Sequence, residues 1–260
     1  MKDRDLFETV EEVFDIFTEK NILLLYRKNI LKKLYGVVSS GKESRIYWGL
    51  GKDNRELAVK IYLTMTAEFR RGILKYIIGD PRFERIPVGD YRKLIYEWTR
   101  KEYRNLRRMR TSGVSVPEPI AFYGNVLIME FLGEKGRRAP LLKEMTPILE
   151  ENRGFAASVF SQVVDNYRKT VCNARLIHAD LSEFNIMYWN DTVYFIDVSQ
   201  AVSLEHPYAR EFLGRDLRNL ALFFSNYIEI NELEESISSL ATHVESCSGI
   251  NLAIEDFELL

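Results

Sequence analysis

The feature that most constrains this 260-residue chain is a short run of polar residues set between apolar segments. Asp180 follows the apolar pair Leu176-Ile177, Asn185 comes five positions later, and Asp197 ends the apolar segment 192–196. Carboxylate and amide oxygens are the ligands that Mg²⁺ prefers, and a second carboxylate can accept a proton. A single Asp at the end of a strand is common, but three such residues at these offsets predict a site for chemistry.

Length and composition fit a globular protein with one large domain or two parts that share a cleft. The sequence is 46% hydrophobic and 28% charged, with a formal net charge of -2. No apolar run approaches the roughly 18 residues of a membrane span, and the N-terminus has no signal-peptide pattern. We therefore expect a soluble, cytoplasmic protein without a membrane partner.

Two cysteines, Cys172 and Cys247, lack a Cys-x-x-Cys spacing, and the three histidines are scattered. We expect neither a zinc site nor redox chemistry from them.

Charge is distributed unevenly along the chain. Residues 70–110 contain 13 Lys and Arg against 5 Asp and Glu, whereas residues 219–260 contain 8 acidic residues and no Lys or Arg. A dense basic segment can be a solvent-exposed helix face or a binding surface for nucleotide phosphate or RNA. Composition does not decide between these two interpretations.

The first part of the chain predicts helices and then a hairpin. Apolar periodicity predicts two short helices over 6–17 and 22–34, an extension that packs on the following residues. The spacing Gly36-x-x-x-x-Gly41-Lys42 is that of a Walker A loop, but Glu43 cannot supply its hydroxyl and a strand follows. What remains is a Ser/Gly loop between two strands, which is either a phosphate-covering loop or an ordinary hairpin turn.

A lysine and a glutamate form the second candidate site. Lys60 interrupts the strand pattern over 56–63. Glu102 occupies the apolar stripe of the helix predicted over 90–111, four residues from both Trp98 and Leu106. A carboxylate on a buried stripe needs a cation, so we predict an ion pair between Glu102 and Lys60 rather than a surface salt bridge.

The remaining segments complete the expected order of elements. Residues 64–90 contain Gly and Pro without periodicity and predict a long loop. A hairpin over 120–131 ends in 127–133, which is either a nucleotide-contacting hinge or a buried strand before a turn. Further helices are predicted over 155–172, 211–227 and 233–244.

Together these segments resemble the protein-kinase-like superfamily and, within it, the RIO family of atypical serine protein kinases of the Rio-one type. The likeness covers nearly the whole chain and is carried by Ser39-Ser40-Gly41-Lys42-Glu43-Ser44, Lys60, Glu102, Met129-Glu130-Phe131-Leu132-Gly133, the run from His178 to Ile186, the run from Ile196 to Val202, and His206-Pro207.

The resemblance implies an α+β, two-lobed protein-kinase-like fold with a trimmed C-lobe and no activation segment. The expected parts are a helical extension over 1–34, an N-lobe over 35–133 that ends in the hinge, and a mainly helical C-lobe over 134–260.

The resemblance also assigns expected roles to single residues. Lys60 anchors the ATP phosphates, Glu102 positions Lys60, and Asp180 is the catalytic base. Asn185 and Asp197 hold Mg²⁺, with Mn²⁺ as an alternative ion, and Asp197 can accept phosphate. The remaining cofactor-binding residues are Ser40, Gly41 and Lys42 in the phosphate loop, with the carbonyl of Glu130 and the amide of Leu132 in the hinge.

The family implies a role in maturation of the small ribosomal subunit, with pre-ribosomal particles or RNA bound through the basic segment 70–110. Ala179 stands where protein kinases carry an arginine, Val198-Ser199 follows Asp197, and Asp216 lies only 19 positions after Asp197. We therefore expect poor activity on generic peptides. Two alternatives remain: a small-molecule phosphotransferase of the aminoglycoside or choline kinase type, and an RNA-binding ribosome-assembly module that uses ATP as a switch.

Overall fold

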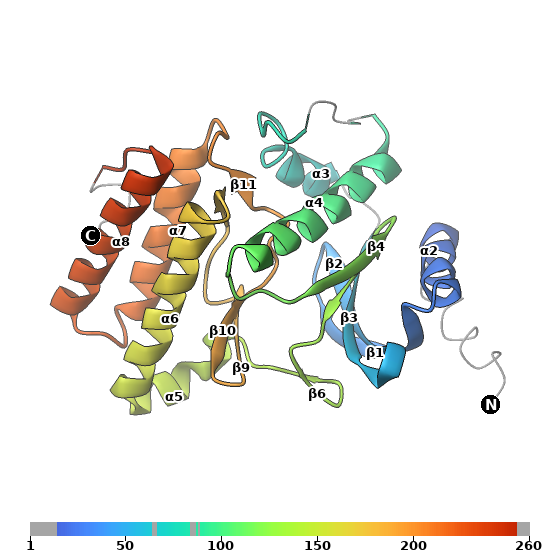
Figure 1. Cartoon of the computed structure of the whole chain (residues 1–260), viewed down its shortest axis with the longest axis horizontal. Coiled ribbons are helices and arrows are strands. Elements are labelled where there is room, and N and C mark those ends of the chain that lie inside the picture. The colour runs from blue at the N-terminus through green and yellow to red at the C-terminus, as the bar shows by residue number, and fades with distance from the viewer. Residues whose placement is uncertain (1–14, 64–66, 84–86, 88, 254–260) are drawn as a thin grey trace. The chain divides into compact units, whose positions relative to one another are not determined.

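The computed structural model describes residues 15–63, 67–83, 87 and 89–253, and the chain forms two compact units (Figure 1). Unit 1 comprises Met1–Arg71, Pro87–Arg104 and Glu118–Arg138. Unit 2 comprises Gly72–Ile86, Asn105–Pro117 and Ala139–Leu260. Each unit is thus assembled from three separate stretches of the sequence. None of the described helices is long and apolar enough to cross a membrane.

Unit 1 is built on an antiparallel sheet whose strand order is β1-β2-β3-β5-β4. The strands are β1 (Leu31–Ser40), β2 (Ser44–Gly51), β3 (Glu56–Tyr62), β4 (Pro119–Tyr123) and β5 (Val126–Glu130), with a 3-10 turn η1 (Lys52–Asn54) before β3. A small hairpin, β6 (Gly133–Glu134) and β7 (Arg137–Arg138), completes the unit. The central strand β3 is buried along almost its whole length, because it has a neighbour on both sides.

Helix α2 (Ile16–Arg27) packs on this sheet, and its N-cap Asp15 accepts a hydrogen bond of 2.7 Å from the amide of Thr18. The shared core consists of Ile22, Leu25, Leu31, Tyr47, Leu57, Val59, Ile61, Val126 and Ile128. The predicted helix over 22–34 is wrong at its end, because Asn29 adopts a positive φ of 56° and the chain enters β1 at Leu31. Most of the helix predicted over 6–17 lies outside the described residues.

The predicted loop over 64–90 is also wrong in part, because it contains helix α3 (Ala67–Leu74). Helix α4 (Tyr91–Thr111) follows close to its predicted bounds. Asp90 precedes it and accepts hydrogen bonds of 3.1 Å from the amides of Arg92 and Lys93, which satisfies two otherwise unpaired donors of the first turn.

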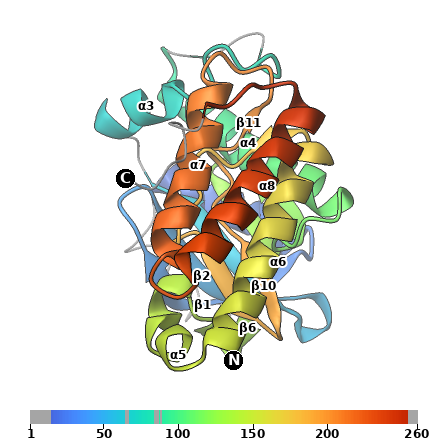
Figure 2. The same ribbon diagram turned by 90° about the vertical axis from the view of Figure 1, so that its left-hand side faces the viewer.

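Unit 2 is mainly helical. Its helices are η2 (Leu142–Met145), α5 (Thr146–Glu151), α6 (Arg153–Cys172), α7 (Ala209–Phe224) and α8 (Ile230–Ser248), and its strands are β8 (Leu176–Ile177), β9 (Ile186–Trp189), β10 (Thr192–Phe195) and β11 (Val202–Ser203). Figure 2 shows α6, α7 and α8 side by side. The apolar stripe of α6 was predicted from Phe155, Val159, Val163 and Tyr167. The last three are fully buried, and Phe155 is partly buried.

A disulfide joins Cys172 at the end of α6 to Cys247 in α8, with the two Cα atoms 5.4 Å apart. The expectation of no redox chemistry at these cysteines missed this pairing, because the residues are 75 positions apart in the sequence. A cross-link that closes so long a loop restricts the unfolded chain.

We predict that replacing both cysteines by serine lowers the free energy of unfolding by up to about 4 kcal/mol, the loop-entropy value for a loop of this length. Urea unfolding with and without a reducing agent measures the effect. Reduction should destabilise the wild-type protein and leave the double-serine variant unchanged. Equal unfolding midpoints for the oxidised and reduced wild-type protein would contradict a stabilising cross-link.

Candidate functional site

In unit 1, Lys60 of β3 and Glu102 of α4 form a buried ion pair. The Lys60 ammonium lies 2.7 Å from Glu102 Oε1, and the two residues are 3% and 1% exposed. The Tyr62 hydroxyl donates a hydrogen bond to the other carboxylate oxygen. The predicted pairing is therefore present. Removing either partner would leave an uncompensated buried charge, so the loss of one residue of this pair would destabilise the unit.

The predicted phosphate loop is the turn between β1 and β2. The Gly41 amide donates a hydrogen bond of 2.9 Å to the carbonyl of Ser44, and Ser40, Gly41 and Lys42 are exposed. A Cβ atom on Gly41 would meet only the Ser44 carbonyl oxygen, at an ordinary contact distance of 3.5 Å. Local packing therefore does not require glycine at this position. A role of the loop in phosphate binding stays a prediction.

The predicted hinge follows β5. Glu130 ends the strand, and its carboxylate accepts a hydrogen bond of 3.0 Å from the Glu118 amide. Leu132 is buried at 4% exposure, and its amide N–H donates to no other residue of the described part of the chain. An unpaired amide donor at the end of a buried strand suits a ligand acceptor.

In unit 2, hydrogen bonds bring Asp180, Asn185 and Asp197 into one segment. The Asn185 amide group donates to the Asp180 carbonyl at 2.7 Å and to Asp180 Oδ2 at 3.3 Å. The Ile196 amide donates to the Asn185 carbonyl at 3.0 Å. His178, fully buried, lies with Nε2 3.1 Å from the Ile196 carbonyl, and Ser199 donates to Asp197 Oδ1 at 3.0 Å.

The two carboxylates of this segment influence each other. Burial raises the pKa of Asp180, and the negative charge of Asp197 raises it further, while Arg215, Asn185 and Lys75 act in the opposite direction.

No donor from the described residues reaches Asn185 Oδ1. The described residues contain no cluster of three His, Cys, Asp or Glu residues suited to a metal. Mg²⁺ usually binds through one or two carboxylates, waters and substrate phosphates, so this oxygen-rich set fits it.

Side chains of helix α7 bind the backbone on either side of Asp180. The fully buried Asp216 accepts hydrogen bonds from the amides of Ala179 at 2.8 Å and Leu181 at 2.9 Å, and from the Tyr167 hydroxyl at 3.1 Å. Arg215 donates to the Ala179 carbonyl, and Asn219 donates to the Leu181 carbonyl at 2.9 Å. These contacts support a positive φ of 67° at Ala179, a conformation that alanine rarely adopts.

The sequence analysis missed Asp216 as part of the site. The signal was present, because Asp216 lies among the buried apolar positions Phe212, Leu213, Leu217 and Leu220 of α7. The same reasoning that identified Glu102, a carboxylate on a buried helix stripe, applies to Asp216.

Asp216 should make stability depend on pH. Burial raises the pKa of Asp216 to about 7, although its hydrogen bonds act to lower it. A carboxyl whose pKa is higher in the folded state stabilises most below its unfolded pKa near 4, and this contribution is lost as pH rises through about 7.

We therefore expect the free energy of unfolding of the wild type, relative to Asp216→Asn, to fall between pH 4 and 7 by up to about 1.4 kcal/mol per pH unit. Denaturant unfolding over this range measures the difference. Glu211→Gln, an exposed change on the same helix, should follow the wild-type curve. A constant difference between wild type and Asp216→Asn across this range would contradict the expectation.

Comparison with known proteins places these features in a family. Residues 45–236 match the RIO domain. The chain is 36% identical over 261 residues to the human serine/threonine-protein kinase RIO1, covering 98% of this chain and 45% of the human protein. It is 40% identical over 224 residues to the RIO-type serine/threonine-protein kinase Rio1 of Haloferax volcanii, covering 86% of this chain and 74% of that protein.

The fold is similar to a solved structure of the Chaetomium thermophilum Rio2 kinase, described as an ADP/Mg²⁺-phosphoaspartate complex. The TM-score is 0.63 at 18% identity, covering 93% of this chain and 74% of that chain. This similarity confirms the predicted α+β, kinase-like fold. The chain spans less than half of the human relative but three quarters of the archaeal one. On the sequence match and the shared fold, this chain belongs to the RIO domain family, in its RIO1-type branch.

Proposed function

We propose that the protein is an ATP- and Mg²⁺-dependent serine/threonine protein kinase with ATPase activity. The observation that carries the proposal is the bond from Asn185 to Asp180 together with the bond from the Ile196 amide to the Asn185 carbonyl, which holds the residue before Asp197, in a chain of the RIO family. In this proposal Asp180 acts on the attacking hydroxyl or water, and Asn185 and Asp197 hold the metal. When bound, Mg²⁺ neutralises charge on the phosphates.

Unit 1 contributes the residues that contact the nucleotide. Lys60 carries the charge for the α- and β-phosphates, and Glu102 fixes the direction of its ammonium. The carbonyl of Glu130 and the amide of Leu132 bind adenine. Ser40, Gly41 and Lys42 cover the phosphates. The glycine at position 41 supports this role, because local packing would accept a larger residue there.

The raised pKa of Asp180 suits a residue that accepts a proton from a substrate hydroxyl and later releases it. We also propose that Asp197 can act as a phosphate acceptor, because the solved Rio2 structure is described as containing phosphoaspartate. In that step an Asp197 carboxylate oxygen bonds to the γ-phosphorus of ATP. The bond between the γ-phosphorus and the β,γ-bridging oxygen breaks, and ADP leaves with that oxygen. Water then cleaves the acyl phosphate and releases inorganic phosphate.

Asp180→Ala and Asp197→Ala should each reduce ATP turnover and autophosphorylation by at least about 100-fold, because general base and metal ligation are lost. Release of ADP and incorporation of labelled phosphate measure the effect. Asp165→Ala, an exchange of a surface carboxylate on α6 that pairs with Arg168 and Lys169, serves as the matched control. Undiminished turnover in both site variants would refute the assignment.

A second activity, binding of RNA or a pre-ribosomal particle, is favoured by the surface of α4. Arg104, Arg107 and Arg110 are exposed along the last two turns of this helix. Not every basic residue of the segment 70–110 is available, since Lys101 is buried with its ammonium 5.1 Å from the Trp98 ring centroid. The exposed arginines are sufficient for phosphate contacts.

We expect binding to a generic RNA that weakens steeply with salt. Replacing Arg104 and Arg107 by alanine should reduce the slope of log K against log salt by up to about 2, roughly one per lost phosphate contact. Fluorescence anisotropy over a salt series measures this slope. Replacing Lys32 and Lys33, exposed on β1, removes the same charge elsewhere and should change the slope less. Absence of binding at low salt would exclude this activity.

A further inference from the structure

The segment Gly72–Ile86 belongs to unit 2, although in chain order it lies between β3 and α4. Its described residues pack against the segment that follows Asp197. The rings of Tyr76 and Phe212 lie 5.3 Å apart. Gly79 has a positive φ of 84°, and a Cβ atom there would come within 2.6 Å of Pro207. Only glycine fits this contact, so the described part of the segment packs closely against Pro207.

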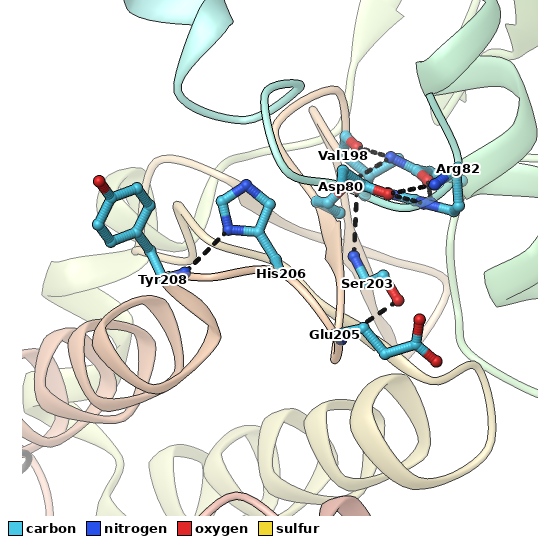
Figure 3. Close-up of polar contacts among 9 residues, drawn as sticks. Asp80, Arg82, Val198, Ser203, Glu205, His206 and Tyr208 are labelled. Carbon is cyan, nitrogen blue, oxygen red and sulfur yellow. Dashed lines mark hydrogen bonds and ion pairs between the residues drawn. The ribbon is translucent and has the colours of Figure 1, made fainter. Parts of the chain in front are cut away.

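Arg82 is the centre of the contact (Figure 3). Its Nε and Nη2 atoms donate to the two carboxylate oxygens of Asp80 at 2.8 and 2.6 Å. Its Nη1 atom donates to Asn105 Oδ1 at 2.7 Å, and Nη2 also donates to the Ala201 carbonyl at 3.0 Å. Asp80 is buried and the Arg82 side chain is 24% exposed, so the ion pair is partly buried, and its paired hydrogen bonds fix its geometry.

Asn105, at the unit 2 end of α4, continues the network. It is fully buried, and its amide group donates to the carbonyls of Val198 at 2.8 Å and Ala201 at 3.0 Å. The Ser203 amide donates to Asp80 Oδ2 at 3.3 Å. The side chains of Asp80, Arg82 and Asn105 therefore bind the backbone at residues 198, 201 and 203, shortly after Asp197.

We propose that Arg82 and Asn105 are positioning residues for Asp197. Asp197 has a positive φ of 53°, a backbone conformation that is uncommon for residues other than glycine. The bonds from Arg82 and Asn105 fix the backbone that leaves Asp197 and so aim its carboxylate. A planar guanidinium is needed, because one group must meet a carboxylate, an amide oxygen and a carbonyl at once. This inference rests on the proposed function of Asp197 as a metal ligand.

Arg82→Lys keeps the charge beside Asp80 but cannot reach both Asn105 and the Ala201 carbonyl. We expect Arg82→Lys, Arg82→Ala and Asn105→Ala each to weaken metal binding about 10- to 100-fold, the usual effect of losing a group that orients a metal ligand. Mn²⁺ binding in the presence of ADP, followed by electron paramagnetic resonance, measures this without turnover. In kinetics, KM for Mg²⁺ should rise while KM for ATP changes little. The Arg82→Ala, Asn105→Ala double variant should be no worse than about the stronger single variant, because the two residues act together.

Arg108→Ala is the matched control. Arg108 lines the same hollow of about 310 Å³ as Arg82, Ser203 and Glu205, and it is exposed. Its guanidinium makes no hydrogen bond to any residue that the structure describes, whereas its backbone carbonyl is hydrogen-bonded. Its removal takes away an equal charge and should leave Mn²⁺ affinity and the KM for Mg²⁺ unchanged.

The outcomes separate this inference from the proposed function. Wild-type Mn²⁺ affinity in folded Arg82→Lys, with or without a lower melting temperature, would overturn the inference alone and leave Arg82 a purely structural residue. A wild-type protein that binds Mn²⁺ with ADP but does not turn over ATP would refute the kinase activity, and the affinities of the variants would still decide the inference. No Mn²⁺ binding by the wild-type protein would overturn both.

Discussion

The backbone around Asp180 depends first on one buried carboxylate. Asp216 receives two backbone amides and a tyrosine hydroxyl, and the amides come from the residues on either side of Asp180. Burying a carboxylate costs free energy unless its oxygens accept hydrogen bonds, so the backbone around Asp180 and helix α7 stabilise each other. The left-handed conformation of Ala179 persists because these bonds, with those of Arg215 and Asn219, over-determine it.

Asp180 and Asp197 are supported in the same way by different parts of unit 2. The backbone around Asp180 is bound by α7. The backbone after Asp197 is bound by Arg82 and by Asn105 near the end of α4. In both cases side chains bind main-chain groups and so fix the backbone that carries Asp180 and Asp197. His178 and Asn185 then connect the two stretches through Ile196.

The sequence was most informative where chemistry interrupts a periodic pattern. Glu102 and Lys60 were predictable because each is a charge inside an apolar element, and a buried charge needs a partner. The helix over 22–34 was extended too far because Ile30, Leu31 and Leu34 keep helical spacing, although tertiary packing places Leu31 in a strand. The Cys172–Cys247 pairing and the contacts of Arg82 join residues 75 and up to 119 positions apart, and no local pattern specifies such contacts.

The origin of unit 2 in three stretches of chain has a consequence for folding. Residues 72–86 and 105–117 are synthesised long before the residues 198–203 that they bind. Until those residues emerge, Asp80 and Asn105 lack their hydrogen bonds to the backbone at residues 198–203, so unit 2 cannot mature stepwise from one end of the chain. A fragment that starts at Ala139 would lack Asp80, Arg82, Asn105 and the Ser115 backbone that pairs with Asn166. The segment that contains Asp180 and Asp197 therefore depends on residues from both halves of the chain.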